Sequence, residues 1–442
     1  MLGRTDSRLR LVLLLLVMAV GAGALGLRLA YWQIGVAPEL QRMADSQMAR
    51  PVVADIERGK IVDRRGTVLA TTGYRDSLAA YPDVMKRAGK VDQVVAGLAS
   101  ILGYDAARRQ ELLTTINESN GRYLNIERRL TQEQSDMIRA GLESESLVAL
   151  GLEAHPVRFY PSPGGAPGTT LANQLLGFVT DDGQGRYGIE QASDELLAGS
   201  GGPTANAAGQ EDVPTTGGSV QLTIDASLQL ALENELQAAY VADKAHRVSG
   251  VIMDPYTGAI LAWASVPGYD ANDYGATANR APQMFTDPIV SEVYEPGSVM
   301  KMFTAAAAIE KGVVGPQTLV EDSRTLLLGD NVVRNFDRRS MGVVPFEDAI
   351  AHSRNVATGR VALMLGQTTE EASTVLYDMW QRLGIGKPTG IELSNEADGI
   401  DHPPTEGEWL RIDLVNRAFG QSVAVTQLQL ARSFAAMING GL

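Results

Sequence analysis

The chain has 442 residues, 45% of them apolar, which is enough for two soluble domains with sizeable cores plus an anchor. Its formal net charge of -14 argues against a nucleic-acid partner, because neutralising phosphates needs a basic face. The chain has no cysteine, which excludes thiol catalysis, disulfides and cysteine-ligated metals, and its four histidines lack metal-ligand spacing, so we expect no metal and no cofactor.

The N-terminus has the pattern of a membrane anchor. Arginines at positions 4, 8 and 10 precede an uncharged, leucine-rich run at 11–27, and the aromatic pair Tyr31 and Trp32 follows. Positive residues, an apolar core and aromatic residues at the far interface are typical of one spanning helix. We therefore expect a cytoplasmic tail at 1–10, an anchor at 11–34 and an extracytoplasmic remainder. A cleaved signal peptide is the alternative, because Ala22–Ala24 offers the small residues that a signal peptidase needs.

The segment at 50–198 is expected to form a first domain. Short strand-like runs alternate there with helical ones, and one helix is predicted at 131–142, with Thr131 as N-cap and Gln134 at the capping-box position. From 199 to 218 the composition changes to Gly, Pro, Thr, Ala and Asn, which indicates a linker or an exposed loop. No later apolar run is long enough to span a membrane again, so we predict a single pass.

A second domain is predicted at 219–442. Apolar and polar residues alternate at 219–224, as in a half-buried strand. A helix is expected at 226–241, with an apolar stripe formed by Leu228, Leu232, Leu236 and Ala239. The turn at 255–258, between apolar runs at 248–254 and 259–266, predicts a β-hairpin. This order indicates an α+β fold with helices packed on an antiparallel sheet.

Ser298 and Lys301 form the first chemical motif. The segment at 294–301 leads into alanine-rich sequence, which places Ser298 in the first turn of a helix with Lys301 on the same face. A serine becomes a nucleophile when a base takes its proton, and a lysine can do so if burial lowers its pKa. The apolar run at 302–309 predicts a helix buried on most sides, which would shield the lysine. Alone, this spacing is more often that of an N-capping serine and a solvated lysine.

Ser353 and Asn355 form the second motif. A hydroxyl and an amide two residues apart on a turn can relay a proton and orient a substrate peptide or the lysine. The alternative is a helix-to-loop junction in which both side chains cap backbone groups. His352 is adjacent, but no aspartate is placed for a Ser-His-Asp triad, so we interpret this histidine as structural.

In this order, the two motifs resemble those of class B penicillin-binding proteins, the transpeptidases that cross-link peptidoglycan. The first domain adds segments similar to the family's pedestal motifs, at Arg58–Gly66 with Leu69 and Ala70, Arg158–Pro161, Leu176–Val179 and Gly188–Glu190. The second adds segments similar to the transpeptidase domain, at Leu222–Asp225, Asp254–Ala262, Tyr294–Ser298, Gly384–Gly390 and Leu428–Ala431. The resemblance covers nearly everything after the anchor, and it favours a retained anchor over a cleaved signal.

The resemblance implies a single anchor helix, an elongated pedestal or dimerisation domain, and a transpeptidase domain of the penicillin-binding and serine β-lactamase type. It implies that Ser298 attacks the D-Ala-D-Ala bond of a stem peptide with Lys301 as base. Ser353 and Asn355 would complete the proton network and position the peptide. β-Lactams would acylate Ser298 as substrate mimics, in a protein of the division or elongation type.

The resemblance also implies partners. No glycosyltransferase segment precedes the pedestal, so a separate polymerase is expected to supply the glycan. The expected partner is a polytopic membrane glycosyltransferase of the shape, elongation, division and sporulation group, together with divisome or elongasome proteins.

One family motif is not found. The third motif, Lys-Thr/Ser-Gly, is expected after the region matching 428–441, and Lys387–Gly390 is no substitute, because it contains a proline and matches an upstream segment. Without that strand the pocket would lack a carboxylate-binding wall and one oxyanion-hole N–H. We therefore expect a C-terminally truncated transpeptidase domain, and we see no clear consequence of Arg354 between Ser353 and Asn355. A catalytically incomplete penicillin-binding scaffold or sensor, and a serine β-lactamase or D,D-carboxypeptidase, are the alternatives.

Overall fold

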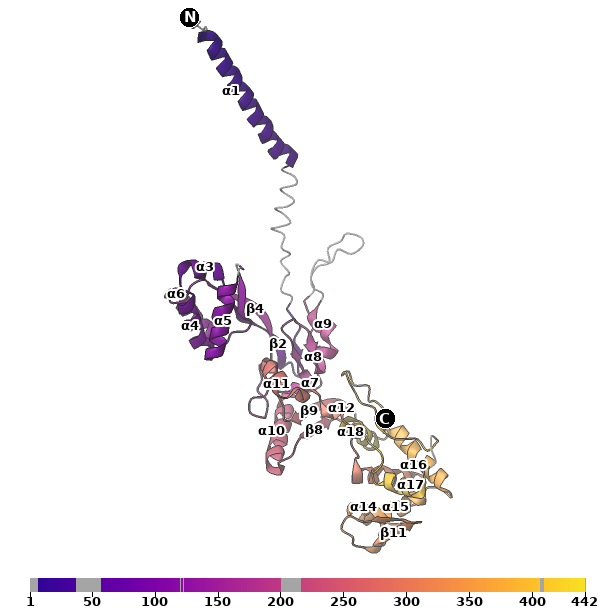
Figure 1. Ribbon diagram of the computed structural model, residues 1–442. Coiled ribbons are helices and arrows are strands. Elements are labelled where there is room, and N and C mark those ends of the chain that lie inside the picture. The colour runs from indigo at the N-terminus through magenta and orange to yellow at the C-terminus, as the bar shows by residue number, and fades with distance from the viewer. Residues whose placement is uncertain are drawn as a thin grey trace. The chain divides into compact units, whose positions relative to one another are not determined.

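The computed structural model describes residues 7–36, 57–119, 121, 123–199, 216–405 and 409–441 (Figure 1). They belong to two units, an N-terminal helical segment and a larger unit that holds the described residues from 57 onward. Residues 1–6 of the predicted cytoplasmic tail, with Arg4, and residues 200–215 of the predicted linker lie outside the described residues.

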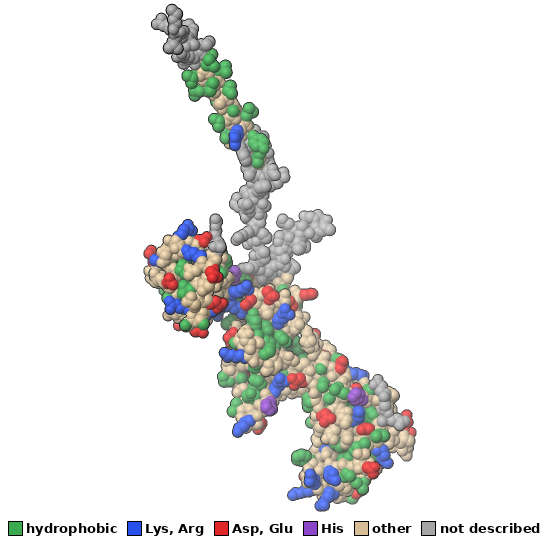
Figure 2. All heavy atoms as spheres, viewed as in Figure 1, with side chains coloured by type: hydrophobic (Ala, Val, Ile, Leu, Met, Phe, Trp, Pro, Cys, Tyr) green, Lys and Arg blue, Asp and Glu red, His purple; other side chains and the backbone are tan. Residues whose placement is uncertain are grey.

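The N-terminal unit is a long apolar helix. Helix α1 spans Ser7–Ala30, and a π-helical turn, Tyr31–Val36, continues it. The stretch Val12–Ala30 has a mean hydropathy of 2.3, and its side chains are exposed, so they form the apolar surface seen along α1 in Figure 2. Among the described residues this is the one helix long and apolar enough to cross a membrane, as a single-pass membrane protein requires.

A ribbon of two long strands forms much of the first sheet of the larger unit. Strand β2 (Val68–Ala80) pairs antiparallel with β4 (Leu150–Phe159), and its end also pairs with β3 (Leu124–Glu127). Four helices follow or flank these strands: α3 (Pro82–Ala88), α4 (Val91–Leu102), α5 (Ala106–Glu118) and α6 (Gln132–Glu143). Their core is aliphatic, with Leu98 of α4 packed in one cluster with Ile116 and Ile138.

The predicted capping box at the start of α6 is confirmed. The Thr131 hydroxyl accepts from the Gln134 backbone N–H at 3.1 Å, and the Gln134 side chain accepts from the Thr131 N–H at 2.9 Å. These two bonds satisfy backbone donors that a helix N-terminus leaves unpaired. The helix therefore begins one residue after Thr131, at Gln132.

The strand predicted at 219–224 is shorter than expected. Strand β7 is only Val220–Gln221, and it lies parallel to β1 (Ile61–Val62) in the sheet of β2, not beside the later hairpin. The next residues bind the neighbouring elements instead, since the Thr223 hydroxyl donates to the Ile260 carbonyl at 2.6 Å. The segment thus ties the start of the second predicted domain to the sheet of the first.

An aromatic core joins short elements from both halves of the larger unit. Phe178 stacks on Tyr274 with ring centroids 4.5 Å apart and lies 4.7 Å from the Phe285 ring. The short elements around this core are α7 (Asn173–Leu176), β5 (Phe178–Val179), β6 (Gly185–Arg186), α8 (Gly188–Ala192), α9 (Asp194–Ala198), α11 (Tyr274–Arg280) and α12 (Pro288–Ser291).

The predicted helix and hairpin of the second domain are confirmed. Helix α10 spans Ala226–Asp243 and packs on an antiparallel pair, β8 (Val248–Met253) and β9 (Ile260–Val266). The predicted apolar stripe is only half-buried; the two buried residues of the helix are Gln229 and Glu233. Both are buried because they bind backbone: Gln229 pairs with the N–H and C=O of Trp263, while Glu233 accepts from Gly165 and Ala172.

The remainder of the larger unit is mainly helical. Its helices are α13 (Lys301–Glu310), α14 (Phe346–Ala351), α15 (Asn355–Leu363), α16 (Thr369–Leu383), α17 (Arg411–Ala418) and α18 (Gln427–Ile438). Two small antiparallel pairs lie beside them: β10 (Leu319–Asp322) with β13 (Gly342–Pro345), and β11 (Thr325–Leu328) with β12 (Asn331–Arg334). Phe303, Phe346 and Trp380 are among the fully buried members of the shared core.

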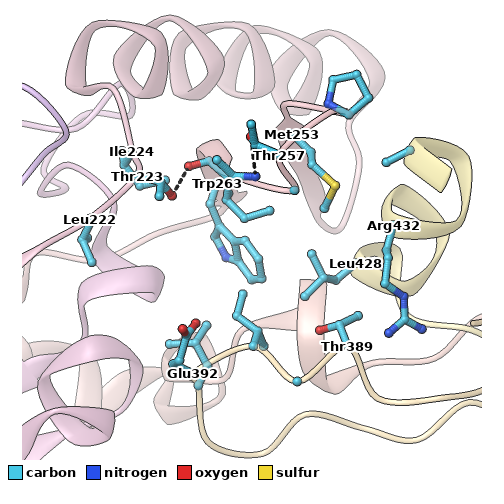
Figure 3. Close-up of a pocket in the computed structure, with 18 of the residues that line it drawn as sticks. Leu222, Thr223, Ile224, Met253, Thr257, Trp263, Thr389, Glu392, Leu428 and Arg432 are labelled. Atoms are coloured by element: carbon cyan, nitrogen blue, oxygen red, sulfur yellow. Dashed lines mark hydrogen bonds between the residues drawn. The ribbon is translucent and has the colours of Figure 1, made fainter. Parts of the chain in front are cut away.

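A cavity of about 1020 Å³ is lined by none of the four predicted site residues. The segment at 219–224, the β8–β9 hairpin, α18 and the loop around Thr389 line it (Figure 3). Trp263 and Leu428 are among the apolar residues that line it, and Arg432 borders it from α18. Thr389 and Gly390 therefore face this cavity and are absent from the lining of the pocket around Ser298.

Candidate active site

Ser298 lies on a turn that leads directly into α13. Residues Gly297–Met300 form a 3₁₀ turn, and Lys301 is the first residue of the α-helix. The prediction of a serine in the first helical turn is correct in position, but this turn is 3₁₀ rather than α-helical. Met300 is fully buried below the turn, whereas Ser298 is exposed.

Backbone contacts with a second loop hold this turn in place. The Gly297 N–H donates to the Gly420 carbonyl at 3.0 Å, and the Ser422 N–H donates to the Glu295 carboxylate at 2.8 Å. A Cβ atom on Gly420, whose φ is +84°, would lie 2.0 Å from the Gly297 carbonyl oxygen. Only glycine fits at Gly420, and the close approach fixes the backbone that carries Ser298.

Lys301 is buried, as the apolar helix predicted. It is 2% exposed, and its Nζ donates to the Ser353 carbonyl at 2.6 Å and to the Ser353 hydroxyl at 2.9 Å. Burial, with a further contribution from the Arg354 charge, lowers the pKa of Lys301 from 10.5 to about 8. A sizeable fraction of the amine is therefore neutral near physiological pH, as a general base requires.

Ser353 and Asn355 lie at the junction between α14 and α15. Ser353 adopts a left-handed backbone with φ of +54°, which is uncommon for a residue with a Cβ. Asn355 begins α15, and its side chain donates to the Arg334 carbonyl at 3.1 Å. Of the two residues predicted to contact Lys301, Ser353 binds its amine, whereas the side chain of Asn355 binds the Arg334 carbonyl instead.

One pocket of about 460 Å³ brings three of the four predicted residues together. We call it the active-site cleft; its lining consists of Gly297, Ser298, Phe336, Asp337, His352, Ser353, Arg354, Asn355, Phe419 and Gln421. Lys301 lies behind it and reaches it through Ser353. Within the described residues no hydrogen bond joins the Ser298 hydroxyl to Lys301, so the proton acceptor is bound to Ser353 in this state.

Arg354, for which the sequence indicated no consequence, has a clear one. It is 7% exposed; its Nε donates to Asp322 at 2.8 Å, and a second nitrogen donates to Asp337 at 3.0 Å. Its charge also contributes to the lowered pKa of Lys301. The sequence signal that could have drawn attention to it is an arginine inside a motif otherwise made of small polar residues.

His352 fits its structural interpretation. Its side chain is exposed at the rim of the cleft, and its Nδ1 lies 2.9 Å from the Asp348 carbonyl oxygen of the preceding turn. In the part of the chain that the structure describes, no group of three or more histidine, aspartate or glutamate side chains could hold a metal ion.

Two family models match the chain. The penicillin binding protein transpeptidase domain matches residues 248–442, and the penicillin-binding protein dimerisation domain matches residues 54–211. The first match contains the whole cleft and Lys301, and the second contains the ribbon of β2 and β4.

Known proteins similar to the chain are named as penicillin-binding proteins or peptidoglycan D,D-transpeptidases. Penicillin-binding protein PbpB of Mycolicibacterium smegmatis is 29% identical over 93% of this chain and 65% of its own length. Peptidoglycan D,D-transpeptidase FtsI of Escherichia coli K12 is 28% identical over 94% of this chain and 68% of its own length.

A solved structure shares the fold. Penicillin binding protein 3 of Mycobacterium tuberculosis, complexed with aztreonam, is 25% identical with a TM-score of 0.61, over 87% of this chain and 64% of that one. The chain thus spans a little under two thirds of the PbpB relative and of this structure. With both domain models matched in this order, the chain belongs to the class B penicillin-binding proteins.

Proposed function

We propose that the chain is a peptidoglycan D,D-transpeptidase, which cross-links stem peptides through an acyl-enzyme on Ser298 and is inhibited by β-lactams. One observation carries the proposal: a buried lysine with its pKa lowered to about 8 lies next to the cleft that exposes Ser298. A nucleophile open to solvent and a base poised near neutral pH are what acyl transfer needs.

The reaction has two steps, acylation of Ser298 and transfer of the acyl group to an amine. The Ser298 Oγ bonds to the carbonyl carbon of the penultimate D-alanine, the peptide C–N bond breaks, and the serine proton passes to the departing amine of the terminal D-alanine. An amine of a second stem peptide then attacks the ester carbon, and Ser298 regains a proton. Lys301 carries the proton in both steps, taking it in its neutral form and returning it as an ammonium.

Ser353 connects the base to the cleft. Its hydroxyl binds Lys301 Nζ at 2.9 Å and also lines the cleft with Ser298, so it can relay the proton between them. Asn355 lines the same cleft with its amide fixed by the Arg334 carbonyl, and it would position the peptide backbone of the substrate. A β-lactam places its strained amide where the D-Ala-D-Ala bond would lie, and Ser298 opens it to the same kind of ester.

The setting of the enzyme is also part of the proposal. α1 would anchor the chain with its N-terminus in the cytoplasm, because the arginines at 4, 8 and 10 lie on that side of the apolar run. The pedestal at 50–198, the linker at 199–218 and the transpeptidase domain at 219–442 would then lie outside. A polytopic membrane glycosyltransferase would supply glycan strands, and divisome or elongasome proteins would bind the assembly.

A fluorescent penicillin tests the reaction. We expect the chain to form a covalent adduct that survives denaturing electrophoresis, and Ser298→Ala to abolish it, because the ester oxygen is missing. A chain that stays unlabelled, like its Ser298→Ala control, contradicts the enzyme and favours a scaffold. Labelling followed by rapid release favours a serine β-lactamase, and release of D-alanine from a pentapeptide without cross-linking favours a D,D-carboxypeptidase.

A further inference from the structure

Three acceptors hold the side chain of Arg354 in place. Its guanidinium donates to the carboxylates of Asp322 and Asp337 and to the Arg339 carbonyl. A planar guanidinium presents several donors in fixed directions, so three acceptors in three directions fix its orientation. We call these residues, together with Asn335, the Arg354 clamp.

The clamp joins three segments, two of which, the loop at 335–341 and the start of α15, contribute residues to the active-site cleft. Asp322, at the end of β10, is fully buried and also accepts from the Asn335 side chain at 2.8 Å and from the Met341 N–H at 2.9 Å. Asn335 in turn accepts from the Val356 N–H of α15 at 3.1 Å. Strand β10, the loop at 335–341 and the start of α15 are therefore fixed to one buried carboxylate.

The residue fixed most directly by this arrangement is Ser353. Its neighbour Arg354 donates its backbone N–H to the Ala349 carbonyl at 2.8 Å, while the side chain is held by the clamp. Between these constraints Ser353 keeps φ at +54° and directs both its carbonyl and its hydroxyl to Lys301 Nζ. A left-handed non-glycine residue costs about 1–2 kcal/mol and persists where its surroundings hold it.

We propose that Arg354 is a positioning residue for acyl transfer, held by Asp322 and Asp337 so that the Ser353 turn keeps both of its oxygens on Lys301. This inference rests on the proposed roles of Ser298 and Lys301. A lysine at position 354 keeps the positive charge but lacks the planar fork, so it satisfies Asp322 without fixing the turn.

Arg354 has a second, electrostatic effect that can be measured separately. Two charged groups act on the Lys301 ammonium: Arg354 disfavours it, and Asp322 favours it. Asp337 and His352 are the other titratable side chains that line the cleft; Asp337 is paired with Arg354, and His352 lies at the Asp348 carbonyl. Removing the guanidinium therefore leaves Asp322 as the dominant charge and raises the pKa of Lys301.

The first experiment compares rates of acylation by a fluorescent penicillin in the full chain. We expect R354K to lower the rate by about tenfold to a hundredfold with little change in its pH dependence, because a small misplacement of a catalytic group has this effect. R354Q should lower it further and move the rise of the rate to higher pH. The matched control is R360K, in helix α15, which Arg354 precedes. Arg360 pairs with the exposed Glu321 at 3.3 Å and donates to the Ser323 hydroxyl at 3.0 Å, so R360K should leave the rate and its pH profile unchanged.

The second experiment measures Lys301 without any reaction. The chain has only seven lysines, at 60, 86, 90, 244, 301, 311 and 387, so ¹³C-labelled lysine gives few side-chain signals, and K301M assigns that of Lys301. We expect it to titrate near pH 8 in the wild type and in R354K, and at higher pH in R354Q. Circular dichroism shows whether R354Q, which leaves Asp322 without its cation, is folded; R354K keeps a cation there.

The outcomes separate the inference from the proposed function. Unchanged acylation in R354K, together with an unchanged Lys301 titration in R354Q, overturns the positioning role. If R354Q does not fold, the acylation rate of R354K decides alone. If the wild type is never acylated while its Lys301 titration depends on Arg354, the transpeptidase proposal fails and the link between Arg354 and Lys301 stands.

Discussion

Glu190 and Asp322 are both fully buried carboxylates, and both are paired with buried arginines. Glu190 binds Arg58 at 2.7 Å and Arg158 at 2.6 Å, which joins three of the predicted pedestal motifs in one cluster. Tyr160 also donates to it at 3.3 Å. In the Arg354 clamp, the arginine instead shares two carboxylates, those of Asp322 and Asp337.

The difference lies in what each cluster adjoins. The Glu190 cluster connects the first described residues of the pedestal with β4 and α8, through partners whose backbone is ordinary. The Arg354 clamp adjoins a left-handed serine and a lysine whose pKa is lowered. Burial and the Glu190 charge raise the pKa of Tyr160 in the first cluster, which only keeps that phenol protonated. A left-handed backbone beside a lysine whose pKa is lowered towards neutrality marks a functional site more reliably than burial of charge does. We infer that the first cluster serves stability and the second serves chemistry.

The largest expected effect comes from Lys301→Met, which keeps the length of the side chain and removes the base. Acylation should fall by roughly 10²–10⁴-fold. Stability at pH 7 should rise, by up to about 3 kcal/mol, because the lowering of the pKa from 10.5 to about 8 measures the cost of burying the ammonium. Penicillin labelling rates and urea unfolding check both.

The matched control for this variant is Lys311→Met. Lys311 is exposed and follows the same helix, so labelling should not change, and stability should change by less than about 0.5 kcal/mol. A Lys301→Met chain that reacts like the wild type, or that is less stable, contradicts the role of Lys301 as a buried base.

Glu190→Ala should lower stability and leave acylation unchanged, the opposite of Lys301→Met. The buried Arg158 and the half-buried Arg58 lose their shared carboxylate, which should lower the free energy of unfolding by about 3–5 kcal/mol. The folded fraction should still be acylated with the wild-type pH profile, because the cluster contains no residue of the cleft. Urea unfolding and labelling measure these effects, with the exposed Glu195→Ala as control. A changed pH profile in Glu190→Ala would show that the two clusters are coupled.

The pH dependence should follow Lys301. Only the neutral amine accepts a proton, so the acylation rate should rise about tenfold per pH unit below pH 8 and level off above it. Stability should rise between about pH 8 and 10.5, because there the unfolded lysine still binds a proton that the folded one has lost. Stopped-flow labelling and urea unfolding across this range test both. Each of these two effects should vanish in Lys301→Met, and a rate that is flat from pH 6 to 9 contradicts the assignment.

Local sequence predicted the local parts of this molecule. The capping box of Thr131 and the hairpin of β8 and β9 depend on residues close together in the chain, and the structure confirms them. The apolar run beside Lys301 likewise predicted its burial, although the partner of its amine lies 52 residues away. The pairing of β7 with β1 joins Val220 to Ile61. The pattern of apolar and polar residues within either segment does not predict this pairing, because the two segments are far apart in the chain. For the same reason, the apolar stripe of α10 did not predict that Gln229 and Glu233 would be buried, because their backbone partners lie in distant segments.

The candidate active-site cleft contains three of the four residues that the sequence singled out, but the sequence did not predict their geometry. Spacing along the chain suggested that Lys301 would face Ser298, whereas its hydrogen bonds go to Ser353. Arg354 was passed over because its partner Asp322 lies 32 residues away and Asp337 lies 17 residues away, in segments that show no motif. The role we propose for Arg354 depends on these two partners, which the motif itself does not reveal.

The smallest expected effect concerns the backbone strain at Ser353, which is compared with a serine in a regular helix of the pedestal. Ser353→Ala and Ser353→Gly both lose the hydroxyl on Lys301, but glycine adopts φ of +54° without steric cost. Ser353→Gly should therefore be more stable than Ser353→Ala, by about 0.5–1 kcal/mol after the greater freedom of the unfolded glycine chain is subtracted.

Ser135, buried in helix α6, provides the matched pair with the opposite sign. There, glycine should be less stable than alanine by about 1 kcal/mol, because a helix interior disfavours it. Thermal unfolding of the four variants measures both differences. If glycine were less stable than alanine at both positions, the left-handed turn at Ser353 would store no strain. The Arg354 clamp would then not be needed to hold that turn.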